Sequence, residues 1–77
     1  MANNYSTEYI AENVYRLRKE KLKLSQEEFS EKAELSKDTI SNIERGVYRP
    51  NLETLVSISN ATDSTVDYFL QKQEKED

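Results

Sequence analysis

The chain has 77 residues, of which 34% are charged and 35% hydrophobic, and its formal net charge at pH 7 is −4. This length and this balance predict one small folded domain rather than a disordered chain. The sequence contains no cysteine, which excludes disulfide bonds and thiolate metal sites, and no histidine, the commonest general base and metal ligand. We therefore expect no enzymatic activity, no cofactor and no metal site. No apolar run is long enough to span a membrane and no leader opens the chain, so we expect a cytoplasmic protein.

The sequence contains five helical patterns and no strand-like alternation, which predicts an all-α fold. In the first pattern, Ile10, Val14 and Leu17 recur on one face of a helix that covers about residues 7–22. The second half of this helix overlaps a basic run that consists of Arg16, Arg18, Lys19, Lys21 and Lys23. The acidic net charge argues against tight nonspecific binding to nucleic acid, which depends on neutralising phosphates. The net charge does not exclude a local basic face formed by this run, although a solvated stripe is the more ordinary interpretation.

Two short helices with a tight connection come next. Ser25 and Glu28 fit a capping box at the start of the second helix. The third helix follows Ser36, another N-cap residue, and ends at Gly46, which suits the left-handed position after a helix. About three residues separate the two helices, which is the length of a helix-turn-helix corner.

A fourth helix follows Pro50, which breaks the chain, and Asn51, which can cap the new helix. One side of this helix is formed by Leu52, Leu55, Val56 and Ser59, with Ile58 beside them. The pattern predicts an amphipathic helix that contributes to the core.

We expect Ser64 to be the N-cap of the fifth helix. The apolar and aromatic residues of this helix belong either to the core or to a dimer interface: Val66, Tyr68, Phe69 and Leu70. We expect Phe69 to lie inside and Tyr68 to lie near a partner subunit. Residues 71–77 form a charged tail with nothing to bury, so we expect it to fray. One domain then covers residues 1–70, with the first few residues as a candidate N-terminal arm.

The third helix carries a polar face opposite its buried pair, Ile40 and Ile43. At about 100° per residue, this face contains Lys37, Asp38, Ser41, Asn42 and Arg45. Asparagine can bond adenine, arginine can bond guanine and aspartate can accept from cytosine, so such a face can read bases. A solvated face is the ordinary alternative. Asp38 in particular either reads a base or only favours the positive end of the helix dipole.

The stretches SQEEFSEKAELSKDTISNIERG, YRPNLETL and STVDYFL resemble the Cro/repressor helix-turn-helix family, also called the XRE family, over about residues 10–70. The resemblance implies a compact five-helix bundle, usually dimeric on a near-palindromic operator, with the third helix in the major groove. It further implies contacts to bases or phosphates from the second helix, the third helix and the loop after it. Together with Arg45 from the polar face, the predicted DNA-binding residues are Gln26, Lys37, Asp38, Thr39, Ser41, Asn42, Arg45, Tyr48 and Arg49.

Three features depart from the family pattern: the residue in the turn, Ser30 where alanine is usual, and the length of the segment after the first helix. Glu34 stands in the turn where the family usually has glycine, which puts a non-glycine residue at a left-handed position. Glu44 matches a family acid that pairs with an arginine of the first helix. The segment RKEKLKLSQ is one residue longer than usual, so the partner of Glu44 is either Arg18 or Lys19.

The sequence thus predicts a transcriptional regulator that binds a double-stranded DNA operator, most simply as a homodimeric repressor. A second hypothesis of another class is an antitoxin-like module that neutralises a partner protein. The acidic composition and the charged tail motivate this alternative.

Overall fold

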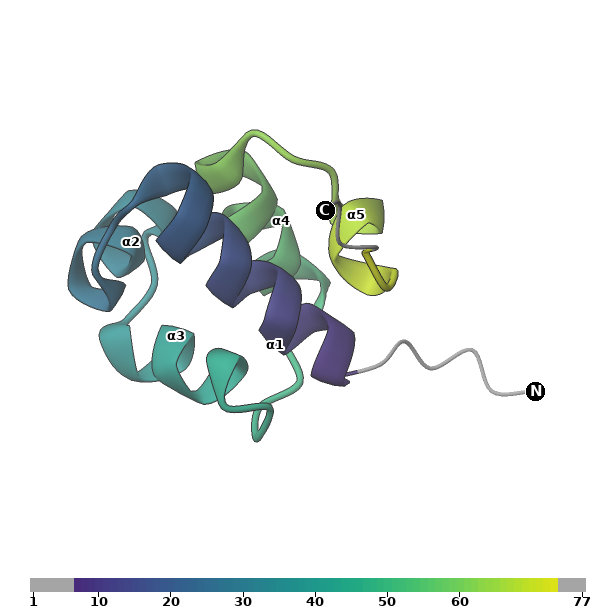
Figure 1. Ribbon diagram of the computed structural model, residues 1–77. Helices are drawn as coiled ribbons and strands as arrows, with labels where there is room; N and C mark the ends of the chain where they lie inside the picture. Colours follow the sequence, from purple (N-terminus) through teal and green to yellow (C-terminus); the bar gives the residue numbers. More distant parts are fainter. Residues whose placement is uncertain (1–6, 74–77) are drawn as a thin grey trace.

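The computed structural model describes residues 7–73, and within these residues all regular structure is helical. The elements in chain order are α1 (Thr7–Arg16), η1 (Leu17–Leu22), α2 (Gln26–Ala33), α3 (Lys37–Glu44), α4 (Leu52–Thr62) and α5 (Val66–Leu70). Figure 1 shows α1 running obliquely across the front, with α2 and α3 on one side, α4 behind it and α5 on the other side. The predicted all-α fold with five α-helices is confirmed for the described part of the chain. The expected N-terminal arm and residues 74–77 of the expected tail lie outside it.

Side-chain caps fix where the helices begin. The predicted capping box of α2 is confirmed, because Ser25 Oγ accepts from the Glu28 N–H at 3.0 Å and Glu28 Oε1 accepts from the Ser25 N–H at 2.9 Å. Asn51 caps α4 as predicted, with its Oδ1 accepting from the Thr54 N–H at 2.9 Å. Each such cap satisfies a backbone donor that the helix itself leaves unpaired, and its loss typically costs about 1 kcal/mol.

The cap of α5 differs from the prediction. Thr65, not Ser64, is the N-cap, and its Oγ1 accepts from the Tyr68 N–H at 3.1 Å. The chain leaves α4 through Asp63 in a left-handed conformation (φ 58°). This turn directs the Ser64 hydroxyl back to the carbonyl of Thr62 at 3.4 Å, and Thr65 then has the extended backbone of a cap residue.

The first predicted helix is not a single α-helix. α1 ends at Arg16 and continues as the π-helical segment η1, which is followed by Lys23 in a left-handed conformation (φ 57°). A π-helical turn holds more residues than an α-helical turn, so the consecutive residues Leu17 and Arg18 both face inward and are buried. The RKEKLKLSQ segment therefore begins within this π-helical turn.

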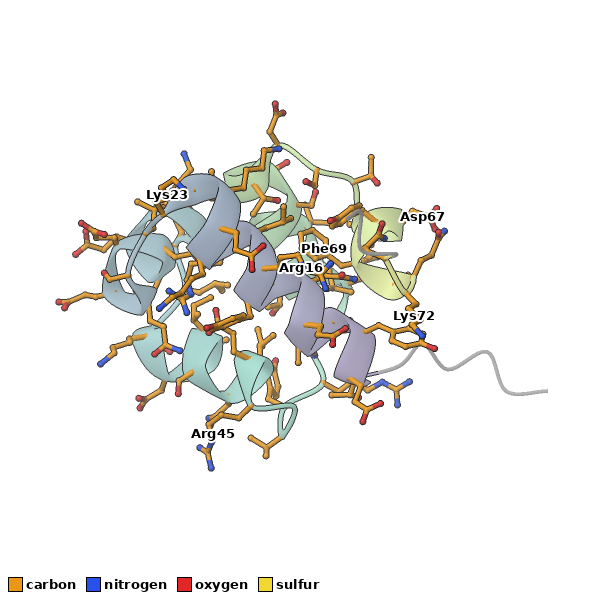
Figure 2. The ribbon with its side chains drawn as sticks, in the orientation of Figure 1. Arg16, Lys23, Arg45, Asp67, Phe69 and Lys72 are labelled. Atoms are coloured by element: carbon orange, nitrogen blue, oxygen red, sulfur yellow. The ribbon has the colours of Figure 1, made fainter. Side chains whose placement is uncertain are left out.

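The core lies where all the helices meet and is made of large side chains with almost no exposed surface: Ile10, Val14, Phe29, Ile40, Ile43, Leu55, Ile58 and Phe69. Burying a side chain of this kind stabilises the fold by about 1.5–3 kcal/mol. Phe69 lies on the side of α5 that faces α1 and is fully buried (Figure 2). Around it, Val66, Tyr68 and Leu70 are half-buried and pack against the core, and a contact of Tyr68 with a partner subunit stays a prediction.

The buried side of α4 is rotated relative to the predicted side. Leu52 and Val56 are 67% and 42% exposed, whereas Leu55 and Ile58 are buried and Thr62 continues the inward face. The hydroxyl of Thr62 donates to the Ile58 carbonyl at 2.9 Å. A polar residue can therefore occupy the inward face without an unpaired donor, and this is why apolar periodicity alone misplaced the face.

A second polar residue of the core was also not anticipated from the sequence. Asn13 of α1 is 1% exposed, and its Nδ2 lies within hydrogen-bonding distance of three carbonyls at the end of α5. The distances are 3.3 Å to Tyr68, 3.1 Å to Phe69 and 2.9 Å to Gln71. Helix C-termini leave carbonyls without intrahelical partners, so the two N–H groups of the Asn13 amide, shared among these carbonyls, help to satisfy them and fasten α5 to α1.

Candidate nucleic-acid interface

The corner between α2 and α3 is closed by backbone and cap hydrogen bonds. α2 ends at Glu34 in a left-handed conformation (φ 60°), and the Leu35 N–H donates to the Ser30 carbonyl at 2.9 Å. Ser36 then caps α3 by accepting from the Thr39 N–H at 3.0 Å. A non-glycine residue in this conformation costs on the order of 1 kcal/mol, so the corner carries mild strain at Glu34.

α3 has an inward face and an outward face. Ile40 and Ile43 are fully buried in the core. The rest of its surface carries the predicted reading residues, all at least partly exposed: Lys37, Asp38, Thr39, Ser41, Asn42 and Arg45. Figure 2 shows Arg45 projecting from the C-terminal end of α3, away from the other helices. The structure thus collects these predicted residues on one helix whose position is set from behind by the core.

A buried ion pair fastens the C-terminal end of α3. Arg18 holds Glu44 with two bonds, Nε to Oε2 at 2.6 Å and Nη2 to Oε1 at 3.0 Å. The side chains are only 8% and 5% exposed. Gln26 Nε2 also donates to Glu44 Oε1 at 3.0 Å, and Arg18 Nη1 donates to the Leu24 carbonyl at 2.8 Å. The partner of Glu44 is therefore Arg18, while Lys19 is exposed.

The hydrogen bonding of the Arg18 guanidinium to the Glu44 carboxylate raises the pKa of Arg18, and burial opposes this rise only in part. The guanidinium also lies over the ring of Tyr15, with its carbon 5.5 Å from the ring centroid. A charged pair with this many contacts joins η1, α2 and α3 rigidly, because each group depends on the others for its hydrogen bonds. The outward face of α3 is thus held in a fixed direction.

Gln26 is the first residue of α2, and its side-chain Nε2 donates a hydrogen bond to Glu44. The backbone N–H groups of a first helical turn have no intrahelical partner, so the start of α2 retains donors even though the side chain is used. Beside it lies a shallow hollow lined by Arg18, Lys19, Lys23, Leu24 and Ser25. The sequence pattern favours a solvated stripe for Lys19 and Lys23. Their position next to the start of α2 makes them candidates for phosphate contact.

The loop after α3 returns to the same end of the helix. Gly46 has φ 77° and ends α3 at the predicted left-handed position. The N–H groups of Val47 and Tyr48 both point to the carbonyl of Asn42, at 3.1 and 3.3 Å. Tyr48 and Arg49 are exposed on this loop. The loop residues predicted to contact DNA therefore lie next to the reading helix.

Comparisons with known proteins agree with this architecture. The family model HTH_3, described as helix-turn-helix, matches residues 14–69. The chain belongs to this helix-turn-helix family. The predicted XRE-type resemblance is thereby confirmed, and the family boundaries include every predicted DNA-binding residue.

Two relatives share the domain. The uncharacterized HTH-type transcriptional regulator y4dL of Sinorhizobium fredii is 41% identical over 59 residues, which are 77% of this chain and 30% of the relative. The uncharacterized HTH-type transcriptional regulator YqaE of Bacillus subtilis is 33% identical over 67 residues, 87% of this chain and 57% of the relative. The chain thus spans less than two thirds of either relative.

A solved structure, a hypothetical transcription factor NHTF from Neisseria, superimposes with a TM-score of 0.80 over 94% of this chain and 87% of that chain. The two sequences are 19% identical, so this match establishes the fold. Within residues 7–73, no helix is long and apolar enough to cross a membrane, and no three acidic, histidine or cysteine residues are grouped as metal ligands.

Proposed function

We propose that the chain regulates transcription by binding a specific sequence of double-stranded DNA, with α3 as the helix that enters the major groove. The observation that carries this proposal is the division of α3 into a buried apolar face and an exposed face of hydrogen-bonding side chains. The major groove admits an α-helix, and each base pair displays there a distinct set of donors and acceptors. The Arg18–Glu44 pair supports the proposal further, because a reading helix needs a fixed direction.

The proposed contacts form two groups. Side chains of α3 face base edges or the nearest phosphates: Lys37, Asp38, Thr39, Ser41, Asn42 and Arg45. Contacts to the backbone come from the start of α2 and the loop after α3: Gln26, Tyr48 and Arg49. Phosphate contacts set the position of the helix on the duplex, and base contacts supply the specificity.

The proposal includes a homodimer that represses by excluding polymerase from its operator, in the cytoplasm. Two copies would place their α3 helices in successive major grooves about 34 Å apart, which requires a near-palindromic site. Leu52 and Val56 support a subunit contact, since they are exposed apolar side chains four residues apart on α4. The names of the two relatives favour a regulator, and the alternative of a module that neutralises a partner protein has no specific support.

The test is selection of binding sites from a random duplex library at a stated salt concentration. Wild type is compared with Lys37→Ala and with Lys32→Ala, a charge-matched control whose side chain lines a hollow between α2 and α4. We expect wild type and Lys32→Ala to recover the same near-palindrome, with half-sites about one helical turn apart, and Lys37→Ala to bind it more weakly. If wild type enriches no sequence, the helix-turn-helix serves another purpose and this proposal is wrong.

A further inference from the structure

Asn42 and Arg45 form a hydrogen-bonded pair on the outward face of α3. Arg45 Nη1 donates to Asn42 Oδ1 at 3.2 Å, and the two residues are three apart on the helix, so they share a face. Arg45 is exposed at the end of the helix and points away from the body of the molecule (Figure 2). The guanidinium therefore has a direction that its neighbour sets.

This bond changes what Asn42 can offer to a base. An asparagine reads adenine with both ends of its amide, because its oxygen accepts from N6 and its nitrogen donates to N7. Here the Asn42 oxygen already accepts from Arg45, which takes one of its two acceptor positions and orients the oxygen towards the guanidinium. The amide nitrogen remains as a donor, and the remaining N–H groups of the guanidinium are donors as well.

We propose that Asn42 and Arg45 act as one reading unit that presents mainly donors to the base edge, and that its base in each half-site is guanine. Guanine is the base whose major-groove edge carries two acceptors, O6 and N7, which match the two N–H groups of an arginine. Arg45 makes the base contact and Asn42 is the positioning residue. The inference rests on the proposed function and specifies which base this part of the site recognises.

The experiment is binding-site selection followed by titration of the selected duplex and its single-base variants, with wild type, Asn42→Ala, Arg45→Ala and the Lys32→Ala control. We expect a guanine in each half-site that wild type and the control prefer by on the order of ten- to a hundredfold over other bases. Arg45→Ala releases the Asn42 oxygen, so the preference at that position should move from guanine towards adenine. Asn42→Ala should keep guanine as the preferred base and reduce the discrimination severalfold, because Arg45 is then unpositioned.

Three results would overturn the inference. One is an adenine preference in wild type that Asn42→Ala abolishes. Another is an equal loss of affinity for all sequences in Arg45→Ala, which would make Arg45 a phosphate contact. The third is unchanged discrimination in Asn42→Ala. An enriched operator with any of these results removes the inference and leaves the proposed function standing, whereas no enrichment by wild type removes both. Thermal unfolding of each variant checks the fold, and both side chains lie at least partly in solvent.

Discussion

Replacing Glu44 by alanine should be among the most destabilising changes on α3. The carboxylate accepts three hydrogen bonds, two from Arg18 and one from Gln26. Without it the Arg18 guanidinium stays buried, with the Leu24 carbonyl as its remaining hydrogen-bond acceptor. Breaking a buried pair by removing one partner costs about 3–5 kcal/mol. The unfolding free energy of a native domain is about 5–15 kcal/mol, so the variant should lose a large part of its stability.

The assay is urea unfolding followed by circular dichroism, for Glu44→Ala, Arg18→Met and the double variant Arg18→Met/Glu44→Leu. Each single variant should lower the unfolding free energy by several kcal/mol, which corresponds to a fall in Tm of more than about ten degrees. The double variant should recover most of the loss, since hydrophobic replacement of a buried pair is often neutral. A cost below about 1 kcal/mol for Glu44→Ala would refute the reasoning, because it is the value of a solvent-screened surface pair.

The raised pKa of Arg18 gives the same pair a defined pH dependence. A group whose folded pKa lies above its unfolded value contributes stability that is fully present below the unfolded value. The contribution is lost only as the pH rises through the folded pKa. For an arginine both values lie in strongly alkaline solution, so Arg18 should cause no change in unfolding free energy near neutral pH.

Four further changes have defined outcomes. Glu34→Gly should raise the unfolding free energy by about 0.5–1 kcal/mol in a urea titration, because glycine removes the left-handed strain. Asn13→Ala should lower it by about 1–3 kcal/mol, since the buried Phe69 carbonyl at the end of α5 loses the amide as its donor; an unchanged value would show that water replaces the amide. Leu52→Glu should shift sedimentation velocity towards the monomer if α4 forms the subunit contact, and a stable dimer would place that contact elsewhere. Asp38→Asn should strengthen nonspecific DNA binding and blur one base position in a binding-site selection, and an unchanged preference would leave Asp38 as a helix-dipole residue.

Helix starts were predictable from the sequence where one residue type decides them. Each of three helices is preceded by a residue whose side chain can accept from an unpaired N–H of the first turn. These residues are the N-caps in the structure: Ser25, Ser36 and Asn51. At the start of α5 two adjacent hydroxyl residues compete, and residue type cannot choose between Ser64 and Thr65. The left-handed residue before them decides the choice, and that conformation is a property of the folded turn.

The buried faces of the helices were less predictable, because those of α1 and α4 include polar side chains that form hydrogen bonds inside the protein. Asn13 and Thr62 occupy core positions, and the partners that permit this are backbone carbonyls. The π-helical segment was likewise not predicted, because no residue type in it distinguishes a π-helix from a continued α-helix. The sequence left Arg18 and Lys19 as alternative partners of Glu44, and the structure pairs Arg18 with Glu44 while Lys19 is exposed.

The acidic composition makes the proposed interface depend on its base contacts. Nonspecific affinity grows with the number of phosphates neutralised, and its logarithm falls with the logarithm of salt concentration by about 0.9 per phosphate contact. The cations near the proposed interface are few, namely Lys19, Lys23, Lys37, Arg45 and Arg49, while the chain as a whole carries −4. Arg45, one of these few cations, donates a hydrogen bond to the Asn42 oxygen. If this bond directs Arg45 towards a base, Arg45 does not neutralise a phosphate. Such a protein would bind random DNA weakly, and its discrimination would rest on whether the bases facing α3 match the donors and the single acid that α3 displays.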